Sequence, residues 1–228
     1  MEETGKNPIQ VAERLFQVIE RLAENGPMGI MELSASLGFH KSTVHRLVAS
    51  LQYMGYIRQD EESLKYALSL KFLEIGSKIL EQTNMASLIH PSLKKLSEQT
   101  GETVHLVRRE GTEAVYIDKV ESTVSSIRMV SRVGSRIPLY CSGVGKALLA
   151  ELPDPEIEDI WNSSEITSLT PYTVTSLSDL MDRIRGVREA GYAMDDEENE
   201  EGVRCIAVSI PDYHKEPVYA LSISAPVS

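Results

Sequence analysis

The chain has 228 residues, of which 42% are hydrophobic and 25% are charged, and its formal net charge is −11. This composition is ordinary for a globular protein, and no apolar run approaches the ~18 residues that a membrane-spanning helix needs. The opening residues MEETGKNPIQ contain no apolar signal-peptide segment, so we expect a cytoplasmic protein with no membrane partner. Cys141 and Cys205 are too few and too far apart for a metal-binding knuckle, so no metal or cofactor is expected.

The negative charge is unevenly distributed along the chain. Residues 1–80 contain nine Lys or Arg and ten Asp or Glu, a net charge of −1. Residues 81–228 contain fourteen and twenty-four, a net charge of −10. An approaching phosphate responds to the local potential, so the first part can carry a basic face although the whole chain is acidic.

Three short helices and a hairpin are predicted in the first third of the chain. IQVAERLFQVIERLAENG has apolar residues at helical spacing and stops at Asn25-Gly26, and MGIMELSASLGF predicts a shorter helix. After Gly55 the apolar period changes to two in YIRQD and LKYALS, which predicts a β-hairpin. The residues expected to face inward on the first and third helices are Val11, Leu15, Val18, Ile19, Leu22, Val44, Leu47, Val48 and Leu51.

The third helix, expected from about residue 41 to 54, begins within the stretch HKSTVHRLV. Taken alone, this polar stretch is typical of a solvated helix face, and Ser42 could simply cap the helix. Three helices followed by a hairpin, however, describe a winged helix-turn-helix, whose third helix enters the major groove of DNA. The predicted DNA-contact residues are Lys41, Ser42, Thr43, His45 and Arg46.

The rest of the chain predicts a helical connector and an α+β domain. Residues 70–82 are amphipathic without a Pro, which favours a helix, and residues 88–99 predict another. TVHLVRREGTEAVYIDKV predicts a hairpin, IRMVSRV, CIAVSI and VYALSISA predict further strands, and SDLMDRIRGVREAGY predicts a helix closed by Gly191. Because helices and strands do not alternate regularly, the pattern favours an antiparallel sheet.

Three patterns that could indicate other chemistry are rejected. SGVGKALL lacks the first Gly and the final Ser or Thr of a phosphate-binding loop, since Tyr140 and Ala147 stand there. DDEENEEG lacks the alternating ligands of a calcium loop, and an acidic run of this kind is usually solvated. Neither cysteine has a sequence feature that pairs it with a histidine base, although His90, His105 and His214 are available. No catalytic or metal-binding residue is therefore predicted.

KSTVHRLVASLQYMGYI resembles the recognition helix of the IclR-type bacterial transcriptional regulators, and KYALSLKFLEIG resembles their wing end and linker helix. The similarity continues in SLKKLSEQTGETVHL, RMVSRVGSRIPLYCSGVGKALLA, REAGYAMDDEENEEGVRCIAVSI and ALSISAP, in family order over nearly the whole chain. The resemblance implies a winged helix-turn-helix DNA-binding domain at residues 5–70. It implies a linker helix and a GAF-like effector domain at residues 71–228, in a homodimer or a dimer of dimers on operator DNA.

The resemblance also implies a pocket for a small organic or sugar acid, closed by the SGVG loop, the DDEEN segment and the last strands. Gly143 would let a ligand approach backbone N–H groups, and Ser hydroxyls can hold a carboxylate without a buried Arg. Cys205 and Ser222 could instead simply pack on inward strand faces. The implied effector-binding residues are Met129, Gly143, Val144, Asp195, Cys205, Ser222 and Ser224.

GIMELS, ESLKYALSLKFLEIG and SRIPLY resemble in particular the regulators of pectin and uronate breakdown, which respond to 2-keto-3-deoxygluconate. This implies a repressor released by that class of acid. Two alternatives stay open: a winged helix that docks a protein partner, and a sensor domain that catalyses a reaction. Family members usually continue into a C-terminal helix, whereas this chain ends at APVS. We therefore expect one face of the effector sheet to lack its usual cover.

Overall fold

The computed structural model of the protein describes residues 7–82, 85–122, 131–211 and 216–227. The chain divides into two compact units, Met1–Gln82 and Thr83–Ser228. The connector helix, expected from the resemblance to belong to the second domain, groups with the first unit. No described helix combines the length and the hydropathy needed to cross a bilayer.

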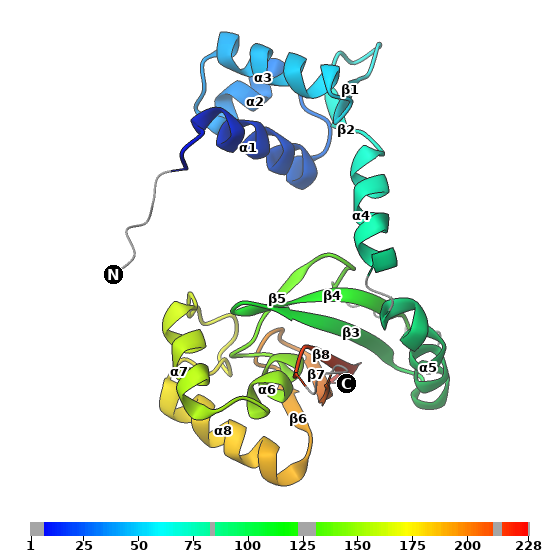
Figure 1. Cartoon of the computed structure of the whole chain (residues 1–228), viewed down its shortest axis with the longest axis vertical. Coiled ribbons are helices and arrows are strands. Elements are labelled where there is room, and N and C mark those ends of the chain that lie inside the picture. The colour runs from blue at the N-terminus through cyan, green and yellow to red at the C-terminus, as the bar shows by residue number, and fades with distance from the viewer. Residues whose placement is uncertain (1–6, 83–84, 123–130, 212–215, 228) are drawn as a thin grey trace. The chain divides into compact units, whose positions relative to one another are not determined.

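The first unit is a winged helix-turn-helix, as predicted. Helices α1 (Gln10–Asn25), α2 (Ile30–Leu37) and α3 (Lys41–Tyr53) enclose one core, and β1 (Ile57–Gln59) pairs with β2 (Tyr66–Leu68) in an antiparallel hairpin (Figure 1). The predicted inward positions Val18, Leu22, Val44, Leu47, Val48 and Leu51 are buried in that core. Leu15 and Ile19 are partly buried against this core, whereas Val11, in the first turn of α1, is 59% exposed.

The connector helix α4 (Lys71–Gln82) begins immediately after the wing and is anchored to it. The Lys71 ammonium donates to the Met54 carbonyl at 2.7 Å and lies 4.3 Å from the centre of the Tyr56 ring. The Phe72 ring lies 5.3 Å from the same Tyr56 ring. These contacts fix the start of α4 against the end of α3 and the first wing strand.

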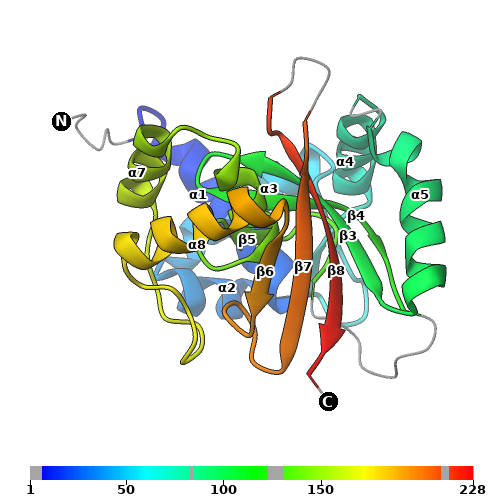
Figure 2. The same cartoon turned by 90° about the horizontal axis from the view of Figure 1, so that it is seen from below.

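The second unit is built on a six-stranded antiparallel sheet, which confirms the predicted α+β class. Its strand order is β5-β4-β3-β8-β7-β6, so the last strand of the chain lies between β3 and β7 (Figure 2). The pairing brings residues 103–110 beside residues 219–226, more than a hundred positions later. The strands are β3 (Thr103–Glu110), β4 (Glu113–Val120), β5 (Arg136–Pro138), β6 (Ala193–Asp196), β7 (Val203–Ile210) and β8 (Tyr219–Pro226).

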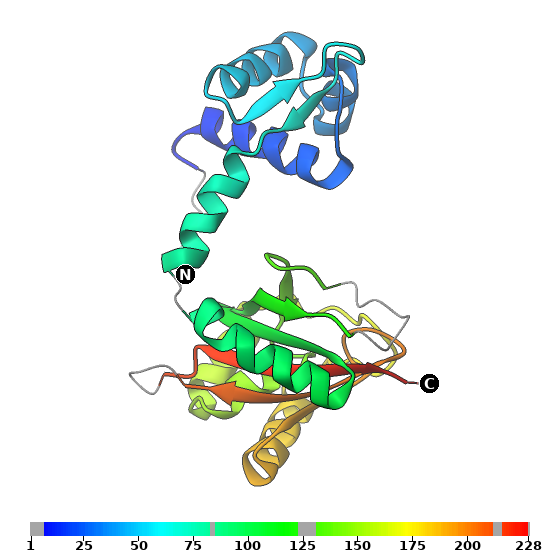
Figure 3. The same cartoon turned by 90° about the vertical axis from the view of Figure 1, so that its right-hand side faces the viewer.

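Helices lie on both faces of this sheet. Helix α5 (Met85–Thr100) covers β3 and β4 on one side, which we call the outer face (Figure 3). Helix α6 (Gly143–Ala150) packs on the opposite, inner face, mainly against β7, β8 and β6. Helix α8 (Leu177–Ala190) packs on α6, and α7 (Asp154–Ser163) contacts α8.

Two local expectations for this unit differ from the structure, and a third, an uncovered part of one sheet face, agrees with it. IRMVSRV was expected to be a strand, yet its described residues 131–133 are not in one, and residues 127–130 lie outside the described part. The SGVG segment is not a loop, because Ser142 caps a helix that begins at Gly143. On the outer face, Ile206 and Val208 of β7 are 50% and 39% exposed, so α5 leaves part of that face uncovered.

Candidate functional site

The predicted DNA-contact residues lie on the side of α3 that faces away from the core. Buried Val44, Leu47, Val48 and Leu51 fix the orientation of the helix. Of the five predicted residues, Thr43 is half-buried and the other four are exposed: Lys41, Ser42, His45 and Arg46.

The beginning of α3 is suited to an anionic partner. The helix contains no Asp or Glu, and neither Lys41 nor Arg46 forms an ion pair with a residue that the structure describes. His40 is the N-cap rather than Ser42, and its side chain accepts no hydrogen bond from the first turn. Backbone N–H groups and the helix dipole at such an end favour phosphate, and the two cations add to that attraction.

Four of the seven residues that the resemblance assigned to the effector pocket lie on the inner face of the sheet: Asp195, Cys205, Ser222 and Ser224. One cross-strand row runs Thr103, Ser224, Cys205 and Asp195, from β3 to β6. The adjacent row runs His105, Ser222, Ala207 and Ala193 across the same strands. Strands far apart in sequence therefore bring Asp195, Cys205, Ser222 and Ser224 together on one surface.

The first turn of α6 closes over these two rows. A Cβ placed on Gly143 would lie 3.4 Å from the Ala207 Cβ and 3.5 Å from the Asp195 Cβ. Gly143 therefore allows α6 to approach the sheet at the level of both rows. Val144, the next residue, is buried in the apolar core of the unit rather than among the polar side chains. Met129 lies outside the described residues.

Burial shifts the pKa values of the ionisable side chains on and beside this surface. Burial raises the pKa of Asp195 to about 6, against hydrogen bonds from the backbone N–H groups of Glu198 and Asn199 that lower it. Burial, together with the nearby Asp195 carboxylate, also raises the pKa of Cys141 and of Cys205 to about 12. Both cysteines are thus thiols near neutral pH, whereas nucleophilic catalysis requires a thiolate. Cys205 Sγ lies 3.0 Å from Ser224 Oγ and can donate to it.

His105 is a member of this polar surface that the sequence analysis did not assign to the pocket. It is 3% exposed, and its Nδ1 lies 3.4 Å from Ser222 Oγ and 3.3 Å from Ser224 Oγ. Its Nε2 lies 2.8 Å from Ser131 Oγ, and the Tyr116 ring packs against it at 5.1 Å. The signal that could have identified it is the alternation in TVHLV, where polar Thr103 and His105 share one face of the strand and apolar Val104 and Leu106 share the other.

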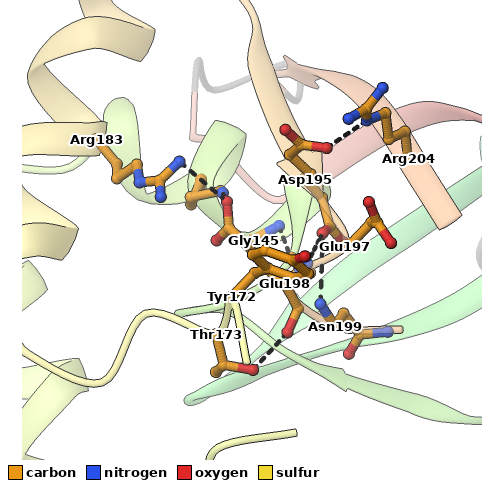
Figure 4. Close-up of polar contacts among 12 residues, drawn as sticks. Gly145, Tyr172, Thr173, Arg183, Asp195, Glu197, Glu198, Asn199 and Arg204 are labelled. Atoms are coloured by element: carbon orange, nitrogen blue, oxygen red, sulfur yellow. Dashed lines mark hydrogen bonds and ion pairs between the residues drawn. The ribbon is translucent and has the colours of Figure 1, made fainter. Parts of the chain in front are cut away.

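A buried ion pair supports the Asp195 side of the surface. Lys146 Nζ on α6 lies 2.5 Å from Glu198 Oε1, and both side chains are 1% exposed. Arg183 on α8 points to the same carboxylate at 3.4 Å, and Thr173 Oγ1 donates to the Glu198 carbonyl at 2.7 Å (Figure 4). The backbone N–H of Glu198 in turn donates to Asp195 Oδ1 at 2.8 Å. The expectation of a solvated acidic run is therefore wrong for Asp195 and Glu198, because both side chains are buried and held by specific partners.

Comparison with known proteins gives a consistent result for both units. The family model of the IclR helix-turn-helix domain matches residues 11–61, and that of the bacterial transcriptional regulator IclR C-terminal region matches residues 77–228. The DNA-binding transcriptional repressor YiaJ of Escherichia coli is 40% identical over 94% of this chain and 77% of its own. The transcriptional regulator KdgR of Escherichia coli is 38% identical over 97% of this chain and 84% of its own.

The same family appears among solved structures. The IclR protein of Thermotoga maritima has a TM-score of 0.79 at 33% identity, covering 95% of this chain and 87% of that one. The C-terminal domain of Escherichia coli KdgR has a TM-score of 0.53 at 39% identity, covering 59% of this chain and 76% of that one. The likeness to KdgR supports the expected KdgR-like subgroup. The chain belongs to the IclR family of bacterial transcriptional regulators, with an N-terminal helix-turn-helix DNA-binding domain and a C-terminal effector-binding domain.

Proposed function

We propose that this regulator is a repressor whose affinity for operator DNA falls when a small organic or sugar acid binds the inner face of its effector sheet. The observation that carries the proposal is the grouping of Asp195, Cys205, Ser222 and Ser224 beneath Gly143. These residues come from three strands and one helix, and they offer hydroxyl and backbone donors to a carboxylate without a buried Arg.

We assign the DNA contacts to the exposed side of α3. Arg46 is expected to reach a base edge or a phosphate, and Lys41, Ser42 and Thr43 are expected to bind mainly phosphates, with His45 beside them. In a dimer the two recognition helices must match a spacing of ~34–36 Å on DNA, or a multiple of it. A homodimer or a dimer of dimers is therefore part of the proposal.

The acid can control DNA affinity only if it binds the DNA-competent and incompetent states with different affinity. A coupling of ~1–3 kcal/mol, equivalent to 5–150-fold in affinity, is ordinary for such regulators. We favour 2-keto-3-deoxygluconate as the acid, because of the similarity to KdgR and to the regulators of uronate breakdown. Pyruvate and glyoxylate are smaller acids with the same 2-oxo carboxylate.

The test is a titration of the full chain with the DNA upstream of its own gene, with and without each of these three acids. One of them should weaken DNA binding at least fivefold, and Ser222→Ala and Gly143→Val should reduce that response. Ser209→Ala is the matched control, because Ser209 also lies in the sheet but its exposed hydroxyl binds Glu151 at 2.7 Å instead. If no acid changes the DNA affinity of the wild type, the proposed effector class is wrong. An equal response in wild type, Ser222→Ala and Gly143→Val would show that the acid does not bind at these residues.

A further inference from the structure

His105 connects the two serines of the effector surface to a segment on its far side. Its Nδ1 faces Ser222 Oγ and Ser224 Oγ, and its Nε2 faces Ser131 Oγ. The ring is held in this orientation by burial and by Tyr116. A neutral imidazole carries a proton on one nitrogen only, so one side of the ring donates while the other accepts.

The choice between the two nitrogens decides what the serines can offer to a ligand. If Nδ1 is unprotonated, it accepts a hydroxyl proton from Ser222 or Ser224, and that serine no longer donates to the pocket. If Nδ1 carries the proton, the N–H is shared between the two serine oxygens and both hydroxyl protons stay available. A carboxylate accepts hydrogen bonds and cannot donate them, so the second arrangement suits it.

We propose that His105 is a positioning residue of the effector site, which as the Nδ1–H tautomer directs the hydroxyl protons of Ser222 and Ser224 toward the carboxylate of a bound acid. The inference rests on the proposed acid effector and adds the residue that decides which groups of its site donate hydrogen bonds. The other partners are compatible with this arrangement. Ser131 can donate to Nε2, and the Cys205 thiol can donate to Ser224 Oγ, 3.0 Å away.

The surroundings of His105 keep its ring neutral at physiological pH, so that either nitrogen can carry the single proton. Burial, and secondly the charge of Lys119 on the neighbouring strand, lower the pKa of His105 to about 4. The ring is therefore neutral at pH 7 and has a single proton to place. An imidazolium would donate from both nitrogens and would leave nothing for the ligand to select.

The tautomer can be read directly in the full chain. The protein has five histidines, so a long-range proton–nitrogen NMR spectrum of the ring-labelled protein is simple, and the His105 signals are those missing from His105→Asn. With saturating 2-keto-3-deoxygluconate, pyruvate or glyoxylate, Nδ1 should have the shift of a protonated nitrogen and Nε2 that of an unprotonated one. An Nε2–H tautomer in the complex would overturn the proposal.

Variants give a second, independent measurement. His105→Asn keeps an N–H donor near the Nδ1 position and should retain the acid response within about threefold of the wild type. His105→Leu offers no donor, and the acid should bind roughly tenfold more weakly or worse, as expected for a weakened hydrogen bond to a charged group. His90→Gln is the matched control, because exposed His90 binds Asp118 on the outer face and should behave like the wild type.

The outcomes separate the two proposals. If wild-type DNA binding responds to an acid but His105→Leu responds equally, the role of His105 is wrong and the proposed function stands. If the wild type responds to none of the acids, the proposed effector class fails and this inference falls with it. Urea unfolding of each variant shows whether the effector unit is folded, and DNA affinity without ligand shows whether the DNA-binding unit is intact.

Discussion

The two units present their candidate residues in opposite ways. In the first unit Lys41 and Arg46 are exposed and contribute nothing to the core that holds α3. In the second unit Asp195, Ser222 and Ser224 are all at most 4% exposed, and they belong to the packed interior. Substitutions of the proposed DNA-contact residues should therefore leave the fold intact, whereas substitutions of the proposed effector residues should alter ligand binding and stability together. The following predictions test that contrast, from the largest expected effect to the smallest.

Gly145→Ala should unfold or severely destabilise the effector unit. A Cβ at Gly145 would lie 2.2 Å from the Leu139 carbonyl oxygen and 2.3 Å from the Leu139 Cα, both backbone atoms that cannot move aside easily. We expect a loss of about 4 kcal/mol or more, measured by urea unfolding. Gly186→Ala on α8 is the control, because its Cβ meets no atom within 4 Å and should stabilise the helix by about 0.5–1 kcal/mol. Similar unfolding midpoints for the two variants would contradict the packing described here.

Glu198→Gln should lower the free energy of unfolding by about 3–5 kcal/mol, because it leaves the Lys146 ammonium buried without its counter-charge. The double variant Lys146→Met/Glu198→Met should recover most of that loss. Asp182→Asn serves as the control, since it breaks an exposed ion pair with Arg185 that is worth about 0.5 kcal/mol or less. Thermal and urea unfolding measure all three, and a double variant no better than Glu198→Gln would argue against a charge effect.

Asp195→Asn should change the pH dependence of stability. The carboxyl keeps its proton up to about pH 6 in the fold but only to its ordinary pKa of 3.8 when unfolded. The stability that it contributes is therefore present below pH 4 and is lost as the pH rises through 6. Between pH 4 and 7 the variant should gain about 2–3 kcal/mol relative to the wild type. His105 titrates in both proteins and cancels in the difference. Urea unfolding at several pH values is the measurement, and a difference independent of pH would refute the assignment.

Arg46→Ala should weaken operator binding by ~1–3 kcal/mol and relax specificity at one base pair, while leaving unfolding unchanged. Fluorescence anisotropy with the operator and with single-base variants of it measures both effects. The contrast between the units predicts that urea unfolding of this variant overlays that of the wild type. Wild-type operator affinity would remove Arg46 from the DNA interface.

Lys41→Ala should have the smallest effect and a different signature. A phosphate contact carries no sequence information, so binding to every DNA should weaken alike. The slope of log K against log salt should flatten by roughly one unit, because one fewer counterion is released. A titration series at several salt concentrations measures the slope. An unchanged slope together with altered base preference would show that Lys41 contacts a base instead.

Elements could be predicted from the sequence where their two faces differ in polarity. Helix α3 alternates apolar and polar residues with a helical period, so its buried and exposed sides could both be named. Helix α6 was missed because residues Gly143 to Leu149 are all buried, which leaves no polar face to reveal the period. The four-residue strand β6 and the three-residue strand β5 are too short to show a period of two.

The candidate effector residues were predicted from the resemblance rather than from local pattern. They come together because strands that are far apart in the sequence pair in one sheet. His105 meets Ser222 and Ser224 only because β8 pairs with β3, and local periodicity contains no information on that register. Glu198 was expected to be solvated because its neighbours are acidic, and its partner Lys146 lies 52 positions earlier. A buried charge of this kind becomes recognisable only when the opposing charge is placed beside it.

The pair formed by Lys146 and Glu198 also bears on how this protein can change over evolutionary time. Replacing Glu198 alone leaves the Lys146 ammonium buried without its counter-charge, and replacing Lys146 alone leaves Glu198 with only the half-exposed Arg183. Drift to an apolar pair must therefore pass through a less stable intermediate. Hydroxyl and thiol positions such as Ser222 and Cys205 face no such barrier, since their exchange for other small residues leaves no charge behind. The proposed effector surface can therefore change by single small steps, while the ion pair beside Asp195 resists change because its intermediates are less stable.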